Sequence, residues 1–125
     1  MSENFFLQQA PFVVPTTDGK LIEEHVGRIA TDENNLSVAH MVAPPGWSEP
    51  HQNPEFDEYT LMVRGRKQIE INGETVTLKS GESLLVRKGV RVQYSNPFEE
   101  EAEYWSVCIP AFSPESVNRE NDSST

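Results

Sequence analysis

Apolar and polar residues alternate with a period of two along most of the chain, which is typical of strands with one buried face. Apolar residues do not recur at intervals of three and four over a long stretch free of proline and glycine, as they do on the buried side of a helix. The pattern therefore predicts an all-β chain. The expected strands cover residues 21–30, 36–43, 58–65, 67–71, 74–78, 82–86, 91–95 and 103–108.

Turn-forming residues separate these segments. Asn72 and Gly73 stand between two alternating segments and predict a tight hairpin, because both central residues of such a turn need a positive φ. Many short strands joined by turns favour a sandwich or a barrel. Proline and glycine also interrupt the pattern at residues 18–19, 44–46, 80–81 and 96–97.

The length of 125 residues suits one domain. Residues 1–112 are predicted to form a single barrel domain with N-terminal strands, and residues 113–125 a polar C-terminal tail. Near the start, residues 5–7 and 12–14 are strongly apolar. We expect them to pack on the sheet or on a partner subunit, because segments of this kind cover sheet edges.

Acidic residues outnumber basic residues by 20 to 10, which gives a net charge of −10. This charge repels phosphate backbones and anionic membranes, so we expect neither nucleic acid nor a membrane as a partner. The first residues lack the positive flank and the long apolar stretch of a secretion signal, so we expect a cytoplasmic protein. The single cysteine, Cys108, lies in an apolar segment, which favours a buried, inert thiol over a nucleophile.

The segment from Gly46 to Gly65 has the most informative spacing. His51 and Asn53 are separated by one residue, four residues lead from Asn53 to Glu58, and six more lead to Gly65. This spacing resembles the first motif of the cupin superfamily, in which a His-x-His pair, a glutamate and a glycine stand at these intervals. Asparagine replaces the second histidine of that motif in this chain.

A later segment resembles the second cupin motif. Gly81, Gly89 and Asn96 keep its spacing, whereas Arg87 replaces a proline and Val92 replaces a histidine. Two motifs in register, with a hairpin between them, cover most of the chain. The resemblance implies a cupin double-stranded β-helix, that is, a jelly-roll barrel with a pocket at its mouth.

The resemblance also implies a metal site, because three imidazoles and a carboxylate hold a divalent metal in a typical cupin. The matching positions here are His51, Asn53, Glu58 and Val92. Valine has no donor atom, and asparagine offers a carbonyl oxygen that suits hard cations. His51, Glu58 and Asn53 are the candidate ligands for manganese, iron or nickel. The alternative is a hydrogen-bonded pair of His51 and Glu58 without a metal.

Alternate residues of both motifs are expected to face the barrel interior, because neighbouring side chains on a strand point to opposite faces. Thr60 and Met62 share a face with Glu58, and Tyr94 shares a face with Val92. The predicted pocket residues are Glu55, Thr60, Met62, Val92 and Tyr94, and the candidate catalytic residues are Glu58, His51 and Tyr94. Clustered carboxylates in the same loop, at Glu49, Glu55 and Asp57, form either a general base or cation site or a solvated acidic loop.

The remaining histidines and the tryptophans do not stand at ligand positions of the resembled motifs. His40 keeps step with apolar residues and is interpreted as a core or interface histidine, and His25 has acidic neighbours and is expected at the surface. Trp47 and Trp105 are expected in the core or an interface, with a pocket wall as the alternative for Trp105.

These observations predict a small-molecule-binding cupin with a degenerate metal site. Its chemistry, if it is an enzyme, is expected to be of the isomerase or lyase type on a small polar substrate, either sugar-like or carboxylic. A metal-dependent oxygenase or isomerase that uses manganese, iron or nickel is one alternative, and a non-catalytic ligand-sensing module is another. A homodimer is expected, because small cupins commonly pair through sheets and N-terminal strands.

Overall fold

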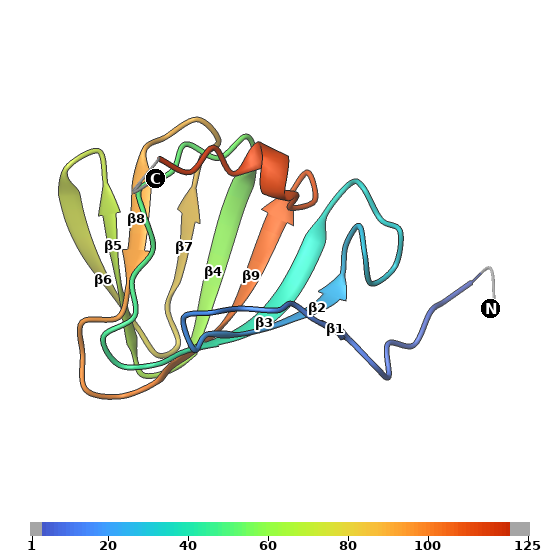
Figure 1. Cartoon of the computed structure of the whole chain (residues 1–125), viewed down its shortest axis with the longest axis horizontal. Helices are drawn as coiled ribbons and strands as arrows, with labels where there is room; N and C mark the ends of the chain where they lie inside the picture. The colour runs from blue at the N-terminus through green and yellow to red at the C-terminus, as the bar shows by residue number, and fades with distance from the viewer. Residues whose placement is uncertain (1–3, 121–125) are drawn as a thin grey trace.

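The computed structural model describes residues 4–120, and strands dominate this part of the chain (Figure 1). The all-β prediction is therefore confirmed. The strands are β1 (Phe12–Val13), β2 (Leu21–Val26), β3 (Ser37–Ala43), β4 (Asp57–Arg64), β5 (Arg66–Ile71), β6 (Glu74–Lys79), β7 (Ser83–Val86), β8 (Val92–Ser95) and β9 (Ala102–Ile109), and a 3₁₀ turn, η1 (Pro114–Ser116), follows them.

The strands form two antiparallel sheets. The larger sheet has six strands in the order β1-β2-β3-β9-β4-β7, and the smaller one has three in the order β6-β5-β8. Strand β9 lies between β3 and β4, although it follows both of them at the end of the chain (Figure 1). Such crossed connections between two packed sheets are those of a jelly roll, as the sequence predicted.

The hairpin between β5 and β6 forms at the predicted position. Asn72 and Gly73 have φ angles of 50° and 86°, and the flanking residues Ile71 and Glu74 pair directly across the turn. Two successive positive φ angles match the twist of the flanking strands. The hairpin extends the smaller sheet away from the rest of the barrel.

The predicted strand over residues 21–30 is too long, because β2 ends at Val26. One carboxylate oxygen of Glu24 accepts backbone hydrogen bonds from Ile29 and Ala30 at 3.0 and 2.8 Å, and the Thr31 amide donates to the Gly27 carbonyl at 3.0 Å. These bonds hold the backbone in a turn, so its amides cannot continue the ladder.

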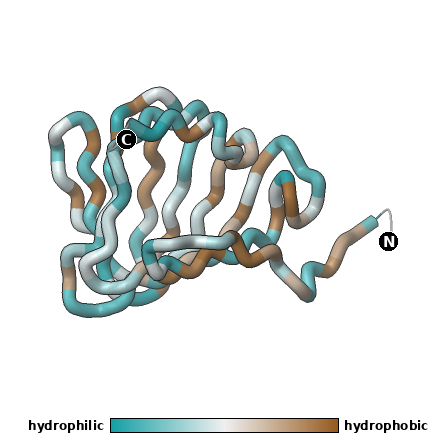
Figure 2. The backbone as a smooth tube through the Cα atoms, viewed as in Figure 1, coloured by the Kyte–Doolittle hydropathy of each residue, from teal (hydrophilic) through white to brown (hydrophobic). Residues whose placement is uncertain are grey.

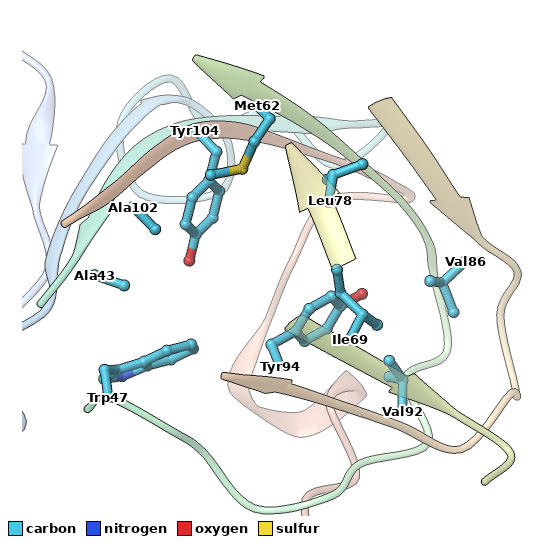
Figure 3. Close-up of a cluster of buried hydrophobic side chains, with 10 residues drawn as sticks. All are labelled: Ala43, Trp47, Met62, Ile69, Leu78, Val86, Val92, Tyr94, Ala102 and Tyr104. Carbon is cyan, nitrogen blue, oxygen red and sulfur yellow. The ribbon is translucent and has the colours of Figure 1, made fainter. Parts of the chain in front are cut away.

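The main core fills the space between the two sheets. Figure 3 shows its side chains converging from both sheets: Ala43, Trp47, Met62, Ile69, Leu78, Val86, Val92, Tyr94, Ala102 and Tyr104. Apolar and polar stretches alternate along the strands (Figure 2), as expected when one side of each strand faces this core. Phe56, Cys108 and Val117 form a smaller buried cluster.

The two ends of the chain behave differently from each other. Residues 5–7 extend away from the barrel (Figure 1), and Phe5, Phe6 and Leu7 are 69%, 53% and 66% exposed, so they do not pack on the sheet of their own chain. At the other end, residues 113–120 lie along the barrel instead of leaving it: Val117 is buried, and the Glu120 amide donates to the His51 carbonyl at 2.7 Å. The last part of the predicted tail, residues 121–125, lies outside the described residues.

Candidate functional site

A cavity of about 660 Å³ lies against the inner face of the larger sheet. Strands β2, β3, β4 and β9 line one side of it. The rest of the wall comes from β5 and β8 and from the segments near residues 12–20, 28–29, 48–56 and 112–119. This volume lies within the range of small-molecule sites. The polar side chains that enter it include Lys20, Glu49, Glu58, Lys67, Tyr94 and Ser106.

Lys67 enters the cavity from strand β5, where it shares the inward face with Ile69. Its residue is only 1% exposed, and its ammonium nitrogen lies 3.6 Å from the centroid of the Tyr104 ring and 4.3 Å from that of Tyr94. No carboxylate among the described residues lies within ion-pair distance of it. Burial lowers the pKa of Lys67, and the ammonium group of Lys20 acts in the same direction.

Lys20 is the second buried lysine of the cavity, and it comes from the turn just before β2. Its ammonium nitrogen lies 4.1 Å from the centroid of the Trp47 ring and 5.4 Å from that of Tyr104. The Trp47 ring is held in place because its Nε1 donates to Asp18 at 2.8 Å. Burial acts to lower the pKa of Lys20, but Tyr104 and Glu49 outweigh it, so the net shift is upward and favours the charged form.

Glu58 is a partly buried carboxylate on the wall of the same cavity. The Ser106 hydroxyl donates to Glu58 Oε2 at 2.5 Å from the neighbouring strand β9. Burial, together with Glu58, raises the pKa of Tyr94 well above its ordinary value, so the phenol keeps its proton. Burial likewise raises the pKa of the Cys108 thiol, which agrees with the expected inert cysteine.

The structure does not bring the candidate metal ligands together. Nε2 of His51 is hydrogen bonded to Oε1 of Glu70 at 2.9 Å, whereas Glu58 faces the cavity and bonds Ser106. Asn53 lies on the outside, where its backbone amide donates to the Asn118 carbonyl at 3.2 Å. Within residues 4–120, no three or more side chains of His, Cys, Asp or Glu gather so that they could hold a metal ion.

Val92 is fully buried in the apolar core and brings no donor atom to the fourth position of the resembled site. The residues at the cupin ligand positions therefore do not fit a divalent cation in this arrangement. The cavity wall carries the lysines Lys20 and Lys67 together with the carboxylates of Glu49 and Glu58.

The predicted pocket residues separate into three groups. Tyr94 lines the cavity together with Glu58. Thr60, Met62 and Val92 point inward but are buried in the packed interior and are not part of the cavity wall. The carboxylate of Glu55 lies outside, where it accepts a hydrogen bond from Asn118 at 2.8 Å.

Sequence reasoning missed Lys20, Lys67 and Ser106. Lys67 carried a usable signal, because it alternates with Ile69 and Ile71 on the inward face of a predicted strand. A charged residue at an inward position indicates either that the register of the predicted strand is wrong or that the residue has a function. Lys20 carried no such signal, because it follows the turn at residues 18–19 and its direction depends on how that turn folds back over the barrel.

His40 lies on the outer face of the larger sheet, away from the cavity. Its Nδ1 and Nε2 are hydrogen bonded to Glu23 at 2.9 Å and to Glu103 at 2.7 Å. Burial acts to lower its pKa, but the two carboxylates outweigh burial and raise it. Trp105 packs between His25 and His40, with ring centroids 5.0 and 5.1 Å away, so it does not form a pocket wall.

The described part of the chain has no helix with the length and apolar character that crossing a membrane requires. This finding fits a fold that is built almost wholly from strands.

Comparison with known proteins links this geometry to one family. The family model described as "Cupin domain" matches residues 39–109, which is more than half of the chain. A protein of Myxococcus xanthus named endoribonuclease YbeY is 47% identical over 108 residues, which are 86% of this chain but only 37% of that protein. The chain thus spans about a third of that relative's length.

Solved structures of low sequence identity share the fold. A variant of Streptomyces PAC13 with uridine superposes with a TM-score of 0.76 at 13% identity, covering 97% of this chain and 93% of that one. A variant of the Bacillus subtilis oxalate decarboxylase gives a TM-score of 0.72 at 19% identity, covering 92% of this chain and 33% of that one. At such identities the similarity establishes the architecture alone.

Proposed function

We propose, from the premise that this chain belongs to the cupin family, that it binds a small carboxylate-bearing molecule in the barrel cavity. Acid–base chemistry on that molecule, of the isomerase or lyase kind, is the activity that the site residues support. The single observation that carries the proposal is the pair of buried lysines, Lys20 and Lys67, on the wall of a cavity of about 660 Å³.

Two buried ammonium groups favour an anionic ligand. A charge withdrawn from water is costly unless an opposite charge compensates it, and Lys67 forms no ion pair within the described chain. Glu58 and Glu49 attract it only from a greater distance. A bound carboxylate would supply that partner and would gain charge-assisted hydrogen bonds in return. The aromatic rings of Tyr94, Tyr104 and Trp47 around the lysines exclude water and strengthen this attraction.

Proton transfer is the reaction that the remaining polar residues support. Glu58 can accept a proton from a bound molecule, and Ser106 orients its carboxylate through the 2.5 Å hydrogen bond. Tyr94 keeps its proton and can donate a hydrogen bond to a developing oxyanion. An isomerase or a lyase of this kind needs at least one acid and one base in the same cavity.

Ligand binding tests the proposal directly. Isothermal titration calorimetry with a panel of small acids (oxalate, pyruvate, tartrate and galacturonate) should give binding to at least one of them, and neutral sugars of the same size should bind more weakly. Lys67→Met should abolish the binding, whereas Lys79→Met, which removes an exposed lysine on the neighbouring strand of the same sheet, should leave it unchanged. Equal binding of acids by wild type and Lys67→Met would contradict the proposal.

Metal content tests the chemistry separately. Plasma mass spectrometry on untagged protein, purified without chelator, should give far less than one manganese, iron or nickel ion per chain. The double variant His51→Ala/Glu58→Gln should not lower that content. A stoichiometric metal that this variant loses would support the metal-dependent oxygenase or isomerase instead.

We also propose that the protein forms a homodimer through the outer face of the larger sheet. Tyr59, Leu61, Val63 and Ile109 point outward from two neighbouring strands, and they are 38%, 43%, 46% and 44% exposed. A contiguous apolar surface of this kind is typical of a protein interface. The exposed residues Phe5, Phe6 and Leu7 lie on an arm that can reach a second copy, as the sequence suggested.

A further inference from the structure

Lys67 differs from an ordinary structural lysine in three respects. It is 1% exposed, it faces a cavity large enough for a ligand, and its ammonium nitrogen lies 4.3 and 3.6 Å from the ring centroids of Tyr94 and Tyr104 without an ion pair among the described residues. Burial and the second lysine, Lys20, both lower its pKa. Desolvation and a neighbouring cation are the two factors that turn a lysine into an amine nucleophile at neutral pH.

We propose that Lys67 forms an imine with the carbonyl carbon of a small 2-oxo acid bound in the barrel cavity. This inference rests on the proposed function, in which the cavity binds a small carboxylate, and it names the class of ligand and the covalent step. A 2-oxo acid carries a group for each lysine. Its carbonyl carbon can react with Lys67, and its carboxylate can pair with Lys20.

Lys20 is the partner for the carboxylate. Its pKa is raised, so it stays charged where Lys67 gives up its proton more readily. The ammonium nitrogens of Lys20 and Lys67 lie 5.4 and 3.6 Å from the centroid of the same ring, that of Tyr104, and both residues line the same cavity.

The covalent step needs no external oxidant, reductant or cofactor. The neutral amine of Lys67 attacks the carbonyl carbon, a C–N bond forms, and the carbonyl oxygen becomes a hydroxyl. The C–O bond then breaks, and the two amine protons leave with the oxygen as water. Protonation of the imine nitrogen gives an iminium ion, which withdraws electrons from the adjacent carbon.

The iminium ion would explain why a base lies in the same cavity. An iminium acidifies the neighbouring C–H bond, and the Glu58 carboxylate, oriented by Ser106, is placed on the cavity wall to accept that proton. Tyr94, which keeps its proton, can return one to another carbon or to a leaving oxygen. Isomerisation and elimination are both consistent with this set of groups.

Reductive trapping tests the inference. The full chain is incubated with pyruvate and sodium cyanoborohydride, and the product is examined by intact mass and by peptide mapping. We expect one reduced pyruvate adduct per chain, located on the peptide that contains Lys67. Because mapping is done on wild-type protein, the result does not depend on the folding of a variant.

Two variants serve as matched comparisons. Lys67→Met should lose the adduct, and Lys79→Met, which removes an exposed lysine, should keep it. Lys20→Met should keep the nucleophile but weaken pyruvate binding and slow trapping. Circular dichroism confirms that each variant is folded before its trapping is compared.

The outcomes separate this inference from the proposed function. Pyruvate binding by calorimetry without an adduct on Lys67, or an adduct spread over exposed lysines, overturns the imine and leaves the binding function intact. An absence of binding by every acid in the panel, together with no adduct, overturns both. A Lys67 adduct that Lys67→Met loses and Lys79→Met keeps supports both.

Discussion

The ammonium nitrogen of Lys67 lies 3.6 Å from the centroid of the Tyr104 ring, and the hydroxyl of that same tyrosine is a buried polar atom without a hydrogen-bond partner in the described structure. Figure 3 shows this hydroxyl pointing inward, toward the side of the barrel where Trp47 lies. A buried hydroxyl without a partner costs free energy in the folded state. Tyr104 is not itself part of the cavity wall, but a ligand beside Lys67 that reaches this hydroxyl and accepts its proton would recover that cost.

Tyr104→Phe should separate the binding role of this hydroxyl from its structural role. Removing an unsatisfied buried hydroxyl should raise the free energy of unfolding by about 1 kcal/mol and weaken carboxylate binding by about the same amount. Urea unfolding and calorimetry measure the two effects. Tyr59→Phe, on the exposed outer face, is the matched control and should change neither quantity. A destabilised Tyr104→Phe would show that the hydroxyl is bonded in solution.

Lys67→Met should remove a pH dependence of stability. The pKa of Lys67 in the folded protein lies below its ordinary value of 10.5, so the unfolded chain binds more protons between these two values. Stability of the wild type therefore rises with pH in that window. Lys67→Met should be more stable by about 1 kcal/mol below the folded-state pKa, where burying the charge is most costly, and the gain should vanish as the pH reaches 10.5.

Urea unfolding from neutral pH to 10.5 measures this difference. Lys79→Met, at an exposed position, should follow the wild-type curve throughout. A constant difference between Lys67→Met and wild type over the whole range would show that Lys67 titrates normally in the folded protein.

His40→Gln should weaken the protein only at low pH. Glu103 and Glu23 raise the pKa of His40 in the folded state, so the stabilisation is fully present below the ordinary value of 6.5 and is lost as the pH rises through the folded-state value. A loss of about 1 kcal/mol is expected at low pH, because two charge-assisted hydrogen bonds disappear from a partly exposed site. Denaturant unfolding at several pH values measures it.

The matched control is His25→Gln, which removes the other imidazole that packs on Trp105. Its effect should not depend on pH in the same way, because lost packing is independent of protonation. Equal losses for His40→Gln at low and high pH would mean that packing, and not charge, makes up the contribution of His40.

Gly65→Ala and Gly81→Ala should differ sharply, although both glycines have a positive φ (78° and 87°). A Cβ at Gly65 would collide with the backbone carbonyl of Glu101, whereas one at Gly81 would meet nothing within 4 Å. Gly81→Ala should cost about 1 kcal/mol for the backbone conformation alone. Gly65→Ala should cost about 3 kcal/mol or more, because the backbone of β4 or β9 must also move. Thermal and urea unfolding compare the two variants, and equal losses would contradict the expected collision.

Leu61→Lys should dissociate the proposed dimer. Leu61 is 43% exposed on the outer face of the larger sheet, and a lysine there would place a charge within an apolar interface. Sedimentation velocity should show a dimer for the wild type and a monomer for the variant. Thr75→Lys, on the exposed side of the other sheet, should remain dimeric. A wild-type monomer at all concentrations would exclude the interface.

Most of the fold could be predicted from the sequence, because local rules act on neighbouring residues. Alternation places Thr60, Met62 and Val92 inward, and the hairpin at Asn72 and Gly73 follows from the φ angles that the turn needs. The strand predicted over residues 21–30 was too long, because the turn after Val26 depends on hydrogen bonds to the carboxylate of Glu24. A pattern of hydrophobic residues does not show such a contact.

The candidate site was predicted only in part. Glu58 and Tyr94 line the cavity, because each stands at an inward position of a strand. His51 does not join Glu58: its ring is bonded to Glu70 of strand β5, a residue far away along the chain. The spacing of the motif predicts on which strand a side chain lies and to which face of the sheet it points. It does not predict which neighbouring strand supplies its hydrogen-bond partner.

The sequence by itself determined the all-β class, the hairpin, the barrel motifs and the inward faces, because each depends on backbone geometry within a few residues. Only the tertiary structure decided that Lys20 and Lys67 meet around Tyr104 and that His51 turns toward Glu70. These contacts join the turn before β2 to β5 and β9, and the loop before β4 to β5. Their formation depends on how the two sheets close on each other, which side-chain periodicity does not encode.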